Sequence, residues 1–527
     1  MNLKKIIEKK KKYLSLFICV VVAIVITYIS NNITTMNVDL FGNVMKVGKN
    51  TILKENDVYY LSYEYVKENI DNEIYFDDIS KKVVVSTSNG LYKIKTGDNN
   101  INVNFENKEL ANIGVIEKEN RYISLEVLTY AYNLDVSVCN NTIYLYGNFE
   151  HEGKAKYNNV SIYKKPNLRS EIVDYVDKKD EIRVIQEKGN LLLVKVDKKV
   201  GYVSKNVVKY KIKKQEVQAS GEQENKKQVY FFADSNSKSI NSNMPIDAII
   251  LDMFNVTQTS TNLIESDIKT SFLNSVRENK YNIYGMVSNG YDLAGFNTNT
   301  TSQILSDEAK RINLINNLNV KIKEYNLDGI VLEFRKLKER DVENYIQFIK
   351  ELKAFSGIQV AVNIDSSEYK TYIPVINYTD FSIVNAYGQR DLKSTVAGSV
   401  SEIKWMSGII NNCLYKANNK KIVVGIPAYT ILWTEKNSSI IDSEIYNLKS
   451  VQDYIVKNKL ETKEVNGQNY AQLEKGSLKY RIWLEDEFSI KKRLEIIEES
   501  RLRGIAIYKY GYENENLLGE LKKYKEN

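Results

Sequence analysis

The sequence predicts a multidomain chain that ends in a (β/α)8 barrel. Three observations predict this fold class: an apolar stretch after a lysine-rich start, a repeated motif in the next part of the chain, and eight apolar β-runs that alternate with helical stretches in the last part. The length of 527 residues is also too great for one domain. The predicted order is an N-terminal transmembrane helix, a duplicated α+β module, a small β-barrel, and a (β/α)8 (TIM) barrel with an inserted α+β subdomain.

The N-terminus has the pattern of a membrane anchor. Residues 1–12 form a basic segment with six lysines and one glutamate, and the apolar stretch Tyr13–Ile29 follows it. A helix of this length spans roughly 25 Å, near the lower limit for crossing a bilayer. Because the lysines precede the stretch, the positive-inside rule predicts a single-pass membrane protein with an extracytoplasmic body. A cleaved signal peptide and a secreted protein are the alternative, although no convincing cleavage site follows Ile29.

The composition excludes several classes of function. The formal net charge is +7, of which residues 1–12 carry +5, so the rest of the chain carries +2. A nearly neutral body does not favour nucleic-acid binding. The single histidine, His151, provides no histidine-rich metal site, and the three cysteines are scattered, so no metal, cofactor or disulfide framework is expected. The cysteines are Cys19, Cys139 and Cys413.

Residues 37–149 form the duplicated module. The motifs Tyr60–Ser62 and Tyr122–Ser124 each begin a unit that continues with a short amphipathic helix and two β-rich runs. This pattern resembles the copper amine oxidase N-terminal-like domain of exported bacterial wall proteins. The resemblance implies a role in adhesion or spacing and no copper site.

Residues 155–210 are expected to form the small β-barrel, because short runs with alternating apolar residues are separated by tight turns. The segment resembles a bacterial Src-homology-3-like domain through Tyr163–Pro166 and Gly201–Val203. Such domains often bind wall peptides, but Leu192 stands where that family usually has tryptophan, so peptide binding and a spacer role both remain open. Residues 211–227 are charged and lack apolar periodicity, which predicts a flexible linker.

Residues 228–525 contain the eight β-runs and the helical stretches between them. This alternation predicts the (β/α)8 barrel. The connection at about 436–488 is too long for one helix, which predicts an inserted subdomain. The β-runs are VYFFAD, IDAIILDMF, YNIYGMVS, LDGIVLEF, IQVAVNI, FSIVNAYG, KIVVGIPAY and GIAIYKYG.

The fourth β-run, LDGIVLEFRKL at 327–337, bears on the chemistry. Together with SIVNAYGQR, GSVSEIKW, KIVVGIPAYTILW and WLEDEFS, it resembles glycoside hydrolase family 18, and within that family the wall- and spore-associated branch. The family pattern on this strand is D-G-x-(D/N)-x-D-x-E. The resemblance implies that the final Glu protonates the leaving oxygen, while the acetamido group of the substrate acts as the internal nucleophile.

This chain departs from the family pattern at its chemical positions. Asp328 and the following glycine match it, but Val331 replaces the first inward Asp or Asn, Glu333 replaces the middle Asp, and Arg335 replaces the acid. Gly388 stands where the family has an Asp after the sixth strand. A guanidinium group does not release a proton at neutral pH. The sequence therefore predicts a barrel without hydrolytic activity.

Two roles for Glu333 remain open at this point. As a substitute acid it would stand two residues, about 6–7 Å, short of the family position along the strand. Alternatively, Glu333 and Arg335 form a buried ion pair that fills the site.

Four residues are candidate glycan contacts. Tyr508 stands at the position of the family's eighth-strand tryptophan, and Tyr387 retains the family tyrosine of the sixth strand. Trp433 after the seventh β-run could stack on a sugar ring, and Asn289 after the third matches an Asn of the wall-associated branch.

The predicted function is binding of peptidoglycan or another N-acetylated glycan by a membrane-anchored cell-wall protein whose barrel has lost catalysis. One alternative is an active family 18-type glycosidase that resembles an N-acetylglucosaminidase and acts on peptidoglycan. The other is an envelope scaffold whose modules recruit partner proteins.

Overall fold

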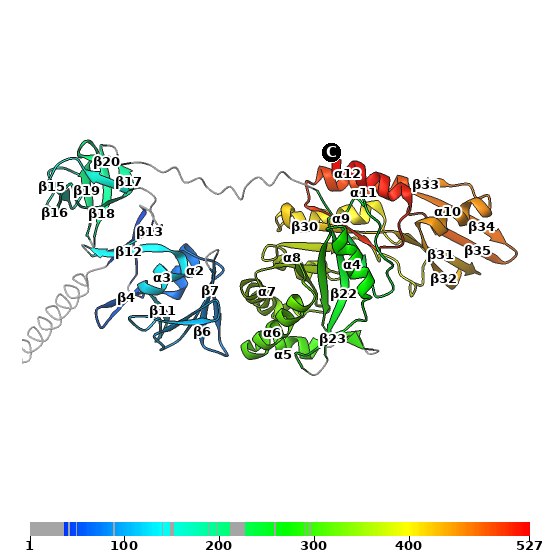
Figure 1. Cartoon of the computed structure of the whole chain (residues 1–527), viewed down its shortest axis with the longest axis horizontal. Coiled ribbons are helices and arrows are strands. Elements are labelled where there is room, and N and C mark those ends of the chain that lie inside the picture. The colour runs from blue at the N-terminus through cyan, green and yellow to red at the C-terminus, as the bar shows by residue number, and fades with distance from the viewer. Residues whose placement is uncertain are drawn as a thin grey trace, which may run out of the picture. The chain divides into compact units, whose positions relative to one another are not determined.

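The computed structural model describes residues 36–40, 43–48, 50–87, 90–139, 141–147, 152–188, 190–197, 199–210, 227–257, 260–289, 291–292, 295–296 and 298–526. The chain divides into two compact units, residues 1–219 and residues 220–527 (Figure 1). The first unit contains the two predicted small modules, and the second contains the predicted barrel.

The prediction of a single-pass membrane protein is corrected. Among the described residues, no helix combines the length and the apolar character that a bilayer crossing requires. The segment on which the prediction rested, Tyr13–Ile29, lies outside those residues, as does most of the predicted linker. The transmembrane helix and the localisation inferred from it are therefore not supported.

The duplicated module has the internal symmetry that its repeat predicts. Strands β4 (Val58–Ser62) and β11 (Arg121–Ser124) pair antiparallel, and each leads directly into a helix, α2 (Tyr63–Asn69) or α3 (Leu125–Tyr132). The serine at the end of each repeated motif caps its helix, because its hydroxyl accepts a hydrogen bond from a backbone N–H three residues later. The repeat therefore encodes a strand, a cap and a helix.

Three sheets complete this module around one apolar core. Their orders are β12-β13-β1-β2, β10-β11-β4-β3 and β5-β6-β7-β8-β9. The remaining strands are β1 (Asn37–Leu40), β2 (Asn43–Lys46), β3 (Ile52–Glu55), β5 (Tyr75–Asp77), β6 (Lys82–Thr87), β7 (Gly90–Lys95), β8 (Asn100–Val103), β9 (Glu106–Glu109), β10 (Val115–Glu117), β12 (Leu134–Cys139) and β13 (Thr142–Gly147).

The second module is a seven-stranded sheet in the order β16-β15-β19-β18-β17-β14-β20. Leu192, which the sequence analysis compared with the tryptophan of Src-homology-3-like domains, lies fully buried in its core and serves packing. The strands are β14 (Glu152–Ala155), β15 (Val160–Tyr163), β16 (Ile172–Val176), β17 (Ile182–Lys188), β18 (Leu191–Val196), β19 (Lys199–Ser204) and β20 (Val208–Tyr210), with a 3-10 turn η1 (Lys205–Val207).

The second unit is a closed barrel. Eight parallel strands hydrogen-bond in the order β21-β36-β30-β29-β28-β27-β24-β22, and β21 also pairs with β22, which closes the ring. Each predicted β-run forms one of these strands, so the (β/α)8 prediction is confirmed. They are β21 (Gln228–Ala233), β22 (Ala248–Val256), β24 (Asn282–Ser288), β27 (Gly329–Glu333), β28 (Gln359–Ile364), β29 (Phe381–Asn385), β30 (Ile422–Pro427) and β36 (Gly504–Tyr508).

Helices cover the outside of the barrel (Figure 1). They pack through an apolar layer between the strands and the helices, while a second, smaller apolar cluster fills the lumen. The helices are α4 (Thr270–Glu278), α5 (Thr298–Ser306), α6 (Glu308–Glu324), α7 (Val342–Ser356), α8 (Tyr369–Ile376), α9 (Ile403–Leu414), α11 (Glu487–Glu499) and α12 (Glu515–Glu526). Short elements are β23 (Leu263–Glu265), β25 (Tyr291–Asp292), β26 (Gly295–Phe296), η2 (Glu339–Asp341) and η3 (Asn419–Lys421).

The inserted subdomain is a five-stranded sheet with one helix, in the order β32-β31-β35-β34-β33. It begins earlier than the predicted residue 436, because only Ala428 separates β30 from β31 and the β-rich pattern continues across it. It also ends before 488, since α11 begins at Glu487. The elements are β31 (Tyr429–Lys436), β32 (Ser439–Asn447), α10 (Leu448–Lys457), β33 (Lys463–Val465), β34 (Gln468–Lys475) and β35 (Leu478–Trp483).

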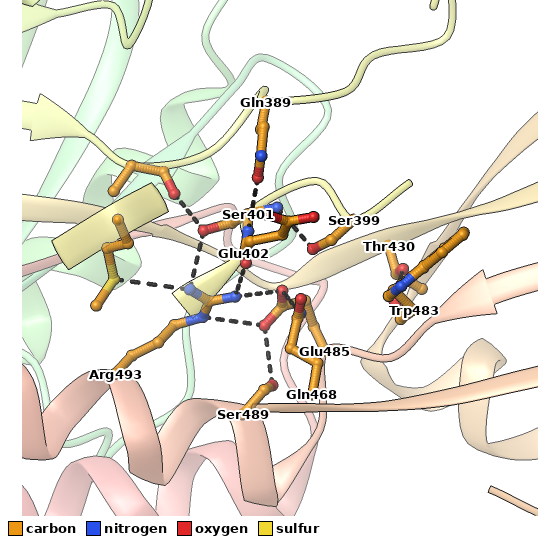
Figure 2. Close-up of polar contacts among 12 residues, drawn as sticks. Gln389, Ser399, Ser401, Glu402, Thr430, Gln468, Trp483, Glu485, Ser489 and Arg493 are labelled. Carbon is orange, nitrogen blue, oxygen red and sulfur yellow. Dashed lines mark hydrogen bonds and ion pairs between the residues drawn. The ribbon is translucent and has the colours of Figure 1, made fainter. Parts of the chain in front are cut away.

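A buried ion pair joins the insertion to the barrel (Figure 2). Arg493 of α11 and Glu485, which follows β35, are both fully buried, and Arg493 Nη2 lies 2.6 Å from Glu485 Oε1. Gln468 of β34 donates to Glu485 Oε1 over 2.8 Å, and Ser489 donates to Oε2 over 2.9 Å. Arg493 also donates to the hydroxyl and the backbone oxygen of Ser401. Both charges are thus compensated by protein groups from three segments of the chain.

Candidate functional site

The candidate site lies at the carboxyl ends of the barrel strands, where side chains of the lumen change from apolar to polar. Val331 of β27, Ala361 of β28 and Ile383 of β29 belong to the apolar lumen cluster. Because side chains alternate between the two faces of a strand, the residues two positions later also face inward. On this argument the polar layer above the cluster consists of Asp234, Asp252, Ser288, Glu333, Asn363 and Asn385, with Tyr508 closing the ring from β36.

Glu333 is the acidic group at the end of β27. Asn363 Nδ2 donates a hydrogen bond to its Oε1 over 2.9 Å. Burial raises the pKa of the Glu333 carboxyl to about 7, and the negative charges of Asp252 and Asp365 add to the shift, while Arg335 and Asn363 oppose it. Glu333 is therefore partly protonated at neutral pH.

Arg335, which the sequence analysis assigns to the position of the family acid, makes its ion pairs with residues other than Glu333. Its Nη2 lies 2.9 Å from Asp365 Oδ2 and 3.5 Å from Glu368 Oε1. Its guanidinium also lies 5.4 Å from the ring centre of Phe296. Arg335 makes no ion pair with Glu333 among the described residues, so the predicted Glu333–Arg335 pair is wrong. The reason is that β27 ends at Glu333, so Arg335 lies beyond the strand, beside the segment that connects β28 to α8.

Asn289 holds the backbone of Arg335. Its Oδ1 accepts the Arg335 N–H over 2.7 Å, and its Nδ2 donates to the Arg335 carbonyl and to Thr301 Oγ1, each over 2.9 Å. Asn289 is buried, and these three bonds use both amide hydrogens and the oxygen. Asn289 therefore positions the segment after β27, and it is not retained as a glycan contact.

Three tyrosines form an aromatic cluster at the other side of the site. The ring centres of Tyr387 and Tyr508 are 5.2 Å apart, and Tyr429 lies 6.0 Å from Tyr508 and 6.4 Å from Tyr387. Tyr508 is 38% exposed, so part of its ring is open to a ligand. Burial raises the pKa of all three hydroxyls, which keeps them protonated. The sequence analysis missed Tyr429, although its place directly after the seventh strand was the available signal.

Trp433 does not face the site. Its side chain is fully buried on β31 against Ala397, Val400 and Ile431, and its Nε1–H donates to the Gly398 carbonyl over 2.9 Å. A fully buried ring has no face for a sugar, so Trp433 is not retained as a glycan contact. The β-rich pattern of the insertion places it in a packed sheet, which the sequence analysis did not foresee.

The remaining positions of the fourth-strand and sixth-strand motifs have structural roles. Asp328 Oδ2 accepts the Ile283 N–H over 2.8 Å and so joins the start of β27 to β24. Val331 is fully buried in the lumen. Gly388 has φ +81°, a backbone conformation that favours glycine, next to Tyr387.

The structure shows no metal site in its described part, since no three His, Cys, Asp or Glu side chains there are grouped to hold an ion. Cys413 is a free, buried thiol on α9, and burial raises its pKa to about 12.

The closed barrel and the polar site at its strand ends are typical of a (β/α)8-barrel enzyme family, and comparison with known families identifies which one. The family model described as glycosyl hydrolases family 18 matches residues 198–513, and the chain belongs to that family. The model of the copper amine oxidase N-terminal domain matches residues 40–146, which confirms the identity of the duplicated module.

Several relatives come from Bacillus. The chain is 22% identical over 277 residues to a protein named uncharacterized glycosylase YvbX of Bacillus subtilis, covering 49% of this chain and 80% of that protein. It is 22% identical over 268 residues to the cortical fragment-lytic enzyme of the same organism, covering 45% of this chain and 59% of the enzyme.

Two solved structures share the barrel fold. The spore cortex-lytic enzyme SleL of Bacillus megaterium QM B1551 superposes with a TM-score of 0.50 at 17% identity, over 56% of this chain and 74% of SleL. A class V chitinase of Pseudomonas fluorescens Pf-5 gives a TM-score of 0.50 at 18% identity, over 57% of this chain and the whole of that chain. At this identity the likeness shows the fold alone.

Proposed function

We propose that the barrel binds peptidoglycan or another N-acetylated glycan without hydrolysing it. The observation that carries the proposal is Arg335 at the position of the family acid, held by Asp365 and Glu368. A guanidinium group does not release a proton at neutral pH because its pKa is above about 12, and this one is held by two carboxylates. The family membership and the names of the glycosylase relatives support a glycan ligand.

The aromatic cluster supports retained binding. Tyr508 is partly exposed at the position where the family has its tryptophan platform, and Tyr387 and Tyr429 hold its ring in place. An aromatic ring that is fixed by neighbours binds a sugar face with little loss of side-chain entropy. Binding can therefore persist where the acid is lost.

The test is a sedimentation assay of the full chain with purified wall glycan, followed by measurement of new reducing ends in the supernatant. We expect the protein to sediment with the glycan and no reducing ends to appear. Release of fragments that stops in Glu333→Gln but continues in the matched control Glu278→Gln would refute the proposal. Glu278 is an exposed carboxylate at the C-terminal end of α4 and precedes β24, so it lies on the side of the barrel where the strands begin and away from the strand ends that form the site.

Hydrolysis through Glu333 is the second candidate, and one observation favours it. A carboxyl whose pKa is about 7 is protonated often enough at neutral pH to act as a general acid. Against it, Glu333 stands two residues before the family position, and displacement of a catalytic group by even about 1 Å can cost on the order of a hundredfold in rate.

This candidate predicts a rate that falls as the pH rises through about 7, because the protonated form of Glu333 is the acid. It also predicts loss of the rate in Glu333→Gln and a reduced rate in Tyr387→Phe. A rate that is the same in Glu333→Gln and in the wild type would exclude Glu333 as the acid.

A further inference from the structure

The cations at the strand ends are already paired. Arg335 is held by Asp365 and Glu368, and the Lys509 ammonium pairs with Asp234. The first pair joins the segment after β27 to the segment after β28, and the second joins the segment after β36 to the segment after β21. Arg335 partly opposes the raised pKa of Glu333, but neither cation forms an ion pair with Glu333 or Asp252 in the described part of the chain.

Two carboxylates of that layer have no cationic partner within the described part of the chain. Glu333 accepts a hydrogen bond from a neutral amide, and Asp252 of β22 makes no ion pair with a described residue. The pKa of Glu333 is raised chiefly by burial and then by Asp252 and Asp365, and the pKa of Asp252 is raised by burial and by Asp234. The inner layer therefore has a deficit of positive charge.

Hydrogen-bond acceptors also lack partners beside Glu333. Asn363 Oδ1 and Asn385 Oδ1 are buried and accept no hydrogen bond, and both side chains are at least nine-tenths buried. The orientation of Asn363 is determined by its Nδ2, which must face the Glu333 carboxylate to donate to it. The unpartnered donor of the region, Arg335 Nε, lies beyond the end of β27 beside two carboxylates.

A ligand group that fits this layer brings positive charge and several N–H donors. An ammonium group has three donors and no acceptor, whereas an acetamido group has one N–H donor, one carbonyl acceptor and no charge. Burial of an unpaired carboxylate is costly, so a cation placed beside the largely buried Glu333 interacts strongly with it, while the exposed Asp252 adds a weaker attraction.

We propose that the inner polar layer binds a hexosamine unit with a free, protonated amino group, that is, a de-N-acetylated unit within the glycan chain. The inference rests on the proposed function and narrows its ligand. The carboxylate of Glu333 pairs with the ammonium group, Asn363 Oδ1 accepts one of its hydrogens, and the tyrosine cluster contacts the sugar rings.

The experiment compares the acetylated tetramer of N-acetylglucosamine with its fully de-N-acetylated counterpart, using the full chain and titration calorimetry. At pH 7 we expect the de-N-acetylated tetramer to bind at least about tenfold more tightly, as is typical where one partner of a buried charge pair is present or absent. Its affinity should pass through a maximum near neutral pH, because Glu333 becomes ionised as the pH rises through about 7 while the amino groups of the sugar lose their protons at higher pH. Binding of the acetylated tetramer should show no such maximum.

Two variants distinguish binding of the ammonium group at Glu333 from a general attraction between a polycation and the acidic groups of the surface. Glu333→Gln should lose the preference for the de-N-acetylated tetramer, while Glu278→Gln, which removes one exposed carboxylate, should keep it. If Glu333→Gln fails to fold, the pH dependence of binding by the wild type gives the same answer, because surface carboxylates titrate at about pH 4 and produce no maximum near neutral pH.

The outcomes distinguish the inference from the proposed function. Equal or tighter binding of the acetylated tetramer at neutral pH overturns the inference and leaves the proposed function standing. Failure to bind either tetramer together with failure to sediment with wall glycan overturns both. A preference for the de-N-acetylated tetramer that Glu333→Gln and Glu278→Gln share equally also overturns the inference, because it reports the surface charge alone.

Discussion

The barrel contains two sets of buried charges that differ in how they are compensated. In the set that joins the insertion to the barrel, Arg493 and Glu485 satisfy each other, and Gln468, Ser489 and Ser401 complete their hydrogen bonds (Figure 2). At the strand ends, Glu333 has one neutral hydrogen-bond donor and no cation.

The difference shows which buried charges serve the fold and which are available to a ligand. Burial raises the pKa of both carboxyls, but at Glu485 the fully buried Arg493 opposes the shift directly. At Glu333 the opposing cation, Arg335, is already paired with Asp365 and Glu368. A charge whose partners are complete stabilises a junction, whereas an incomplete one lowers stability until a ligand completes it.

The largest expected effect on stability comes from breaking the buried pair between Arg493 and Glu485. Arg493→Met leaves the Glu485 carboxylate buried without a cation, so the free energy of unfolding of the barrel unit should fall by about 3–5 kcal/mol, measured by chemical denaturation. The double variant Arg493→Met/Glu485→Gln removes both charges and should recover a large part of the loss. A fall of less than about 1 kcal/mol in the single variant would contradict the structural role assigned to this pair.

Glu333, which has no cationic partner among the described residues, should lower the stability of the fold when it is ionised. The folded protein binds more protons at Glu333 than the unfolded chain between pH 4.5 and about 7, so the free energy of unfolding should decrease as pH rises through this range. A shift of this size corresponds to about 3 kcal/mol. Glu333→Gln removes the titration and should therefore be more stable, relative to the wild type, above pH 7 than below pH 4.5.

Thermal and chemical denaturation across this pH range measure the difference between the two proteins. Glu278→Gln is the control, and its stability relative to the wild type should not change through the same window. A difference between Glu333→Gln and the wild type that does not vary with pH would mean that Glu333 titrates normally.

A smaller effect is expected at the aromatic side of the site. Tyr508→Ala removes the partly exposed ring and should weaken glycan binding by on the order of tenfold, or about 1.4 kcal/mol. Tyr508→Phe keeps the ring and should bind within about twofold of the wild type. Calorimetry with an N-acetylglucosamine tetramer is the measurement, and unchanged affinity in Tyr508→Ala would remove this tyrosine from the binding surface.

The smallest effect concerns the single hydrogen bond to Glu333. Asn363→Ala removes the N–H that stabilises the ionised carboxylate, so the pKa of Glu333 should move further above about 7. Such a bond contributes on the order of 0.5–1.5 kcal/mol. A carbon-13 NMR titration of the Glu333 carboxyl reports the shift, and a pKa that falls in this variant would contradict the assigned contact.

Most of the barrel could be predicted from the sequence, because each strand has its own apolar run. The eight β-runs all became strands of one closed sheet. The repeat of Tyr60–Ser62 in Tyr122–Ser124 likewise predicted two matching units, since a serine cap and the first turn of a helix are local features. The predicted membrane anchor was not supported, and the insertion begins several residues before the predicted boundary.

The candidate site was predictable only in part. The substitution at Arg335 is visible in the sequence, but its partners, Asp365 and Glu368, follow a different strand and could not be found from local pattern. The prediction that Arg335 pairs with Glu333 was wrong for the same reason. Trp433 has a residue type common in sugar sites, yet its burial depends on the loop at 397–400, which is remote in sequence.

By itself, the sequence determined the order of the modules, the strands of the barrel and the presence of a guanidinium group at position 335. These depend on short-range periodicity and on the chemistry of one side chain. Only the tertiary structure decided which charges are compensated, because the partners of Glu333 and Arg335 come from β28 and the segment after it, which pairing of the barrel strands brings beside them. Electrostatic energy depends on distance and burial, and neither is a property of position along the chain.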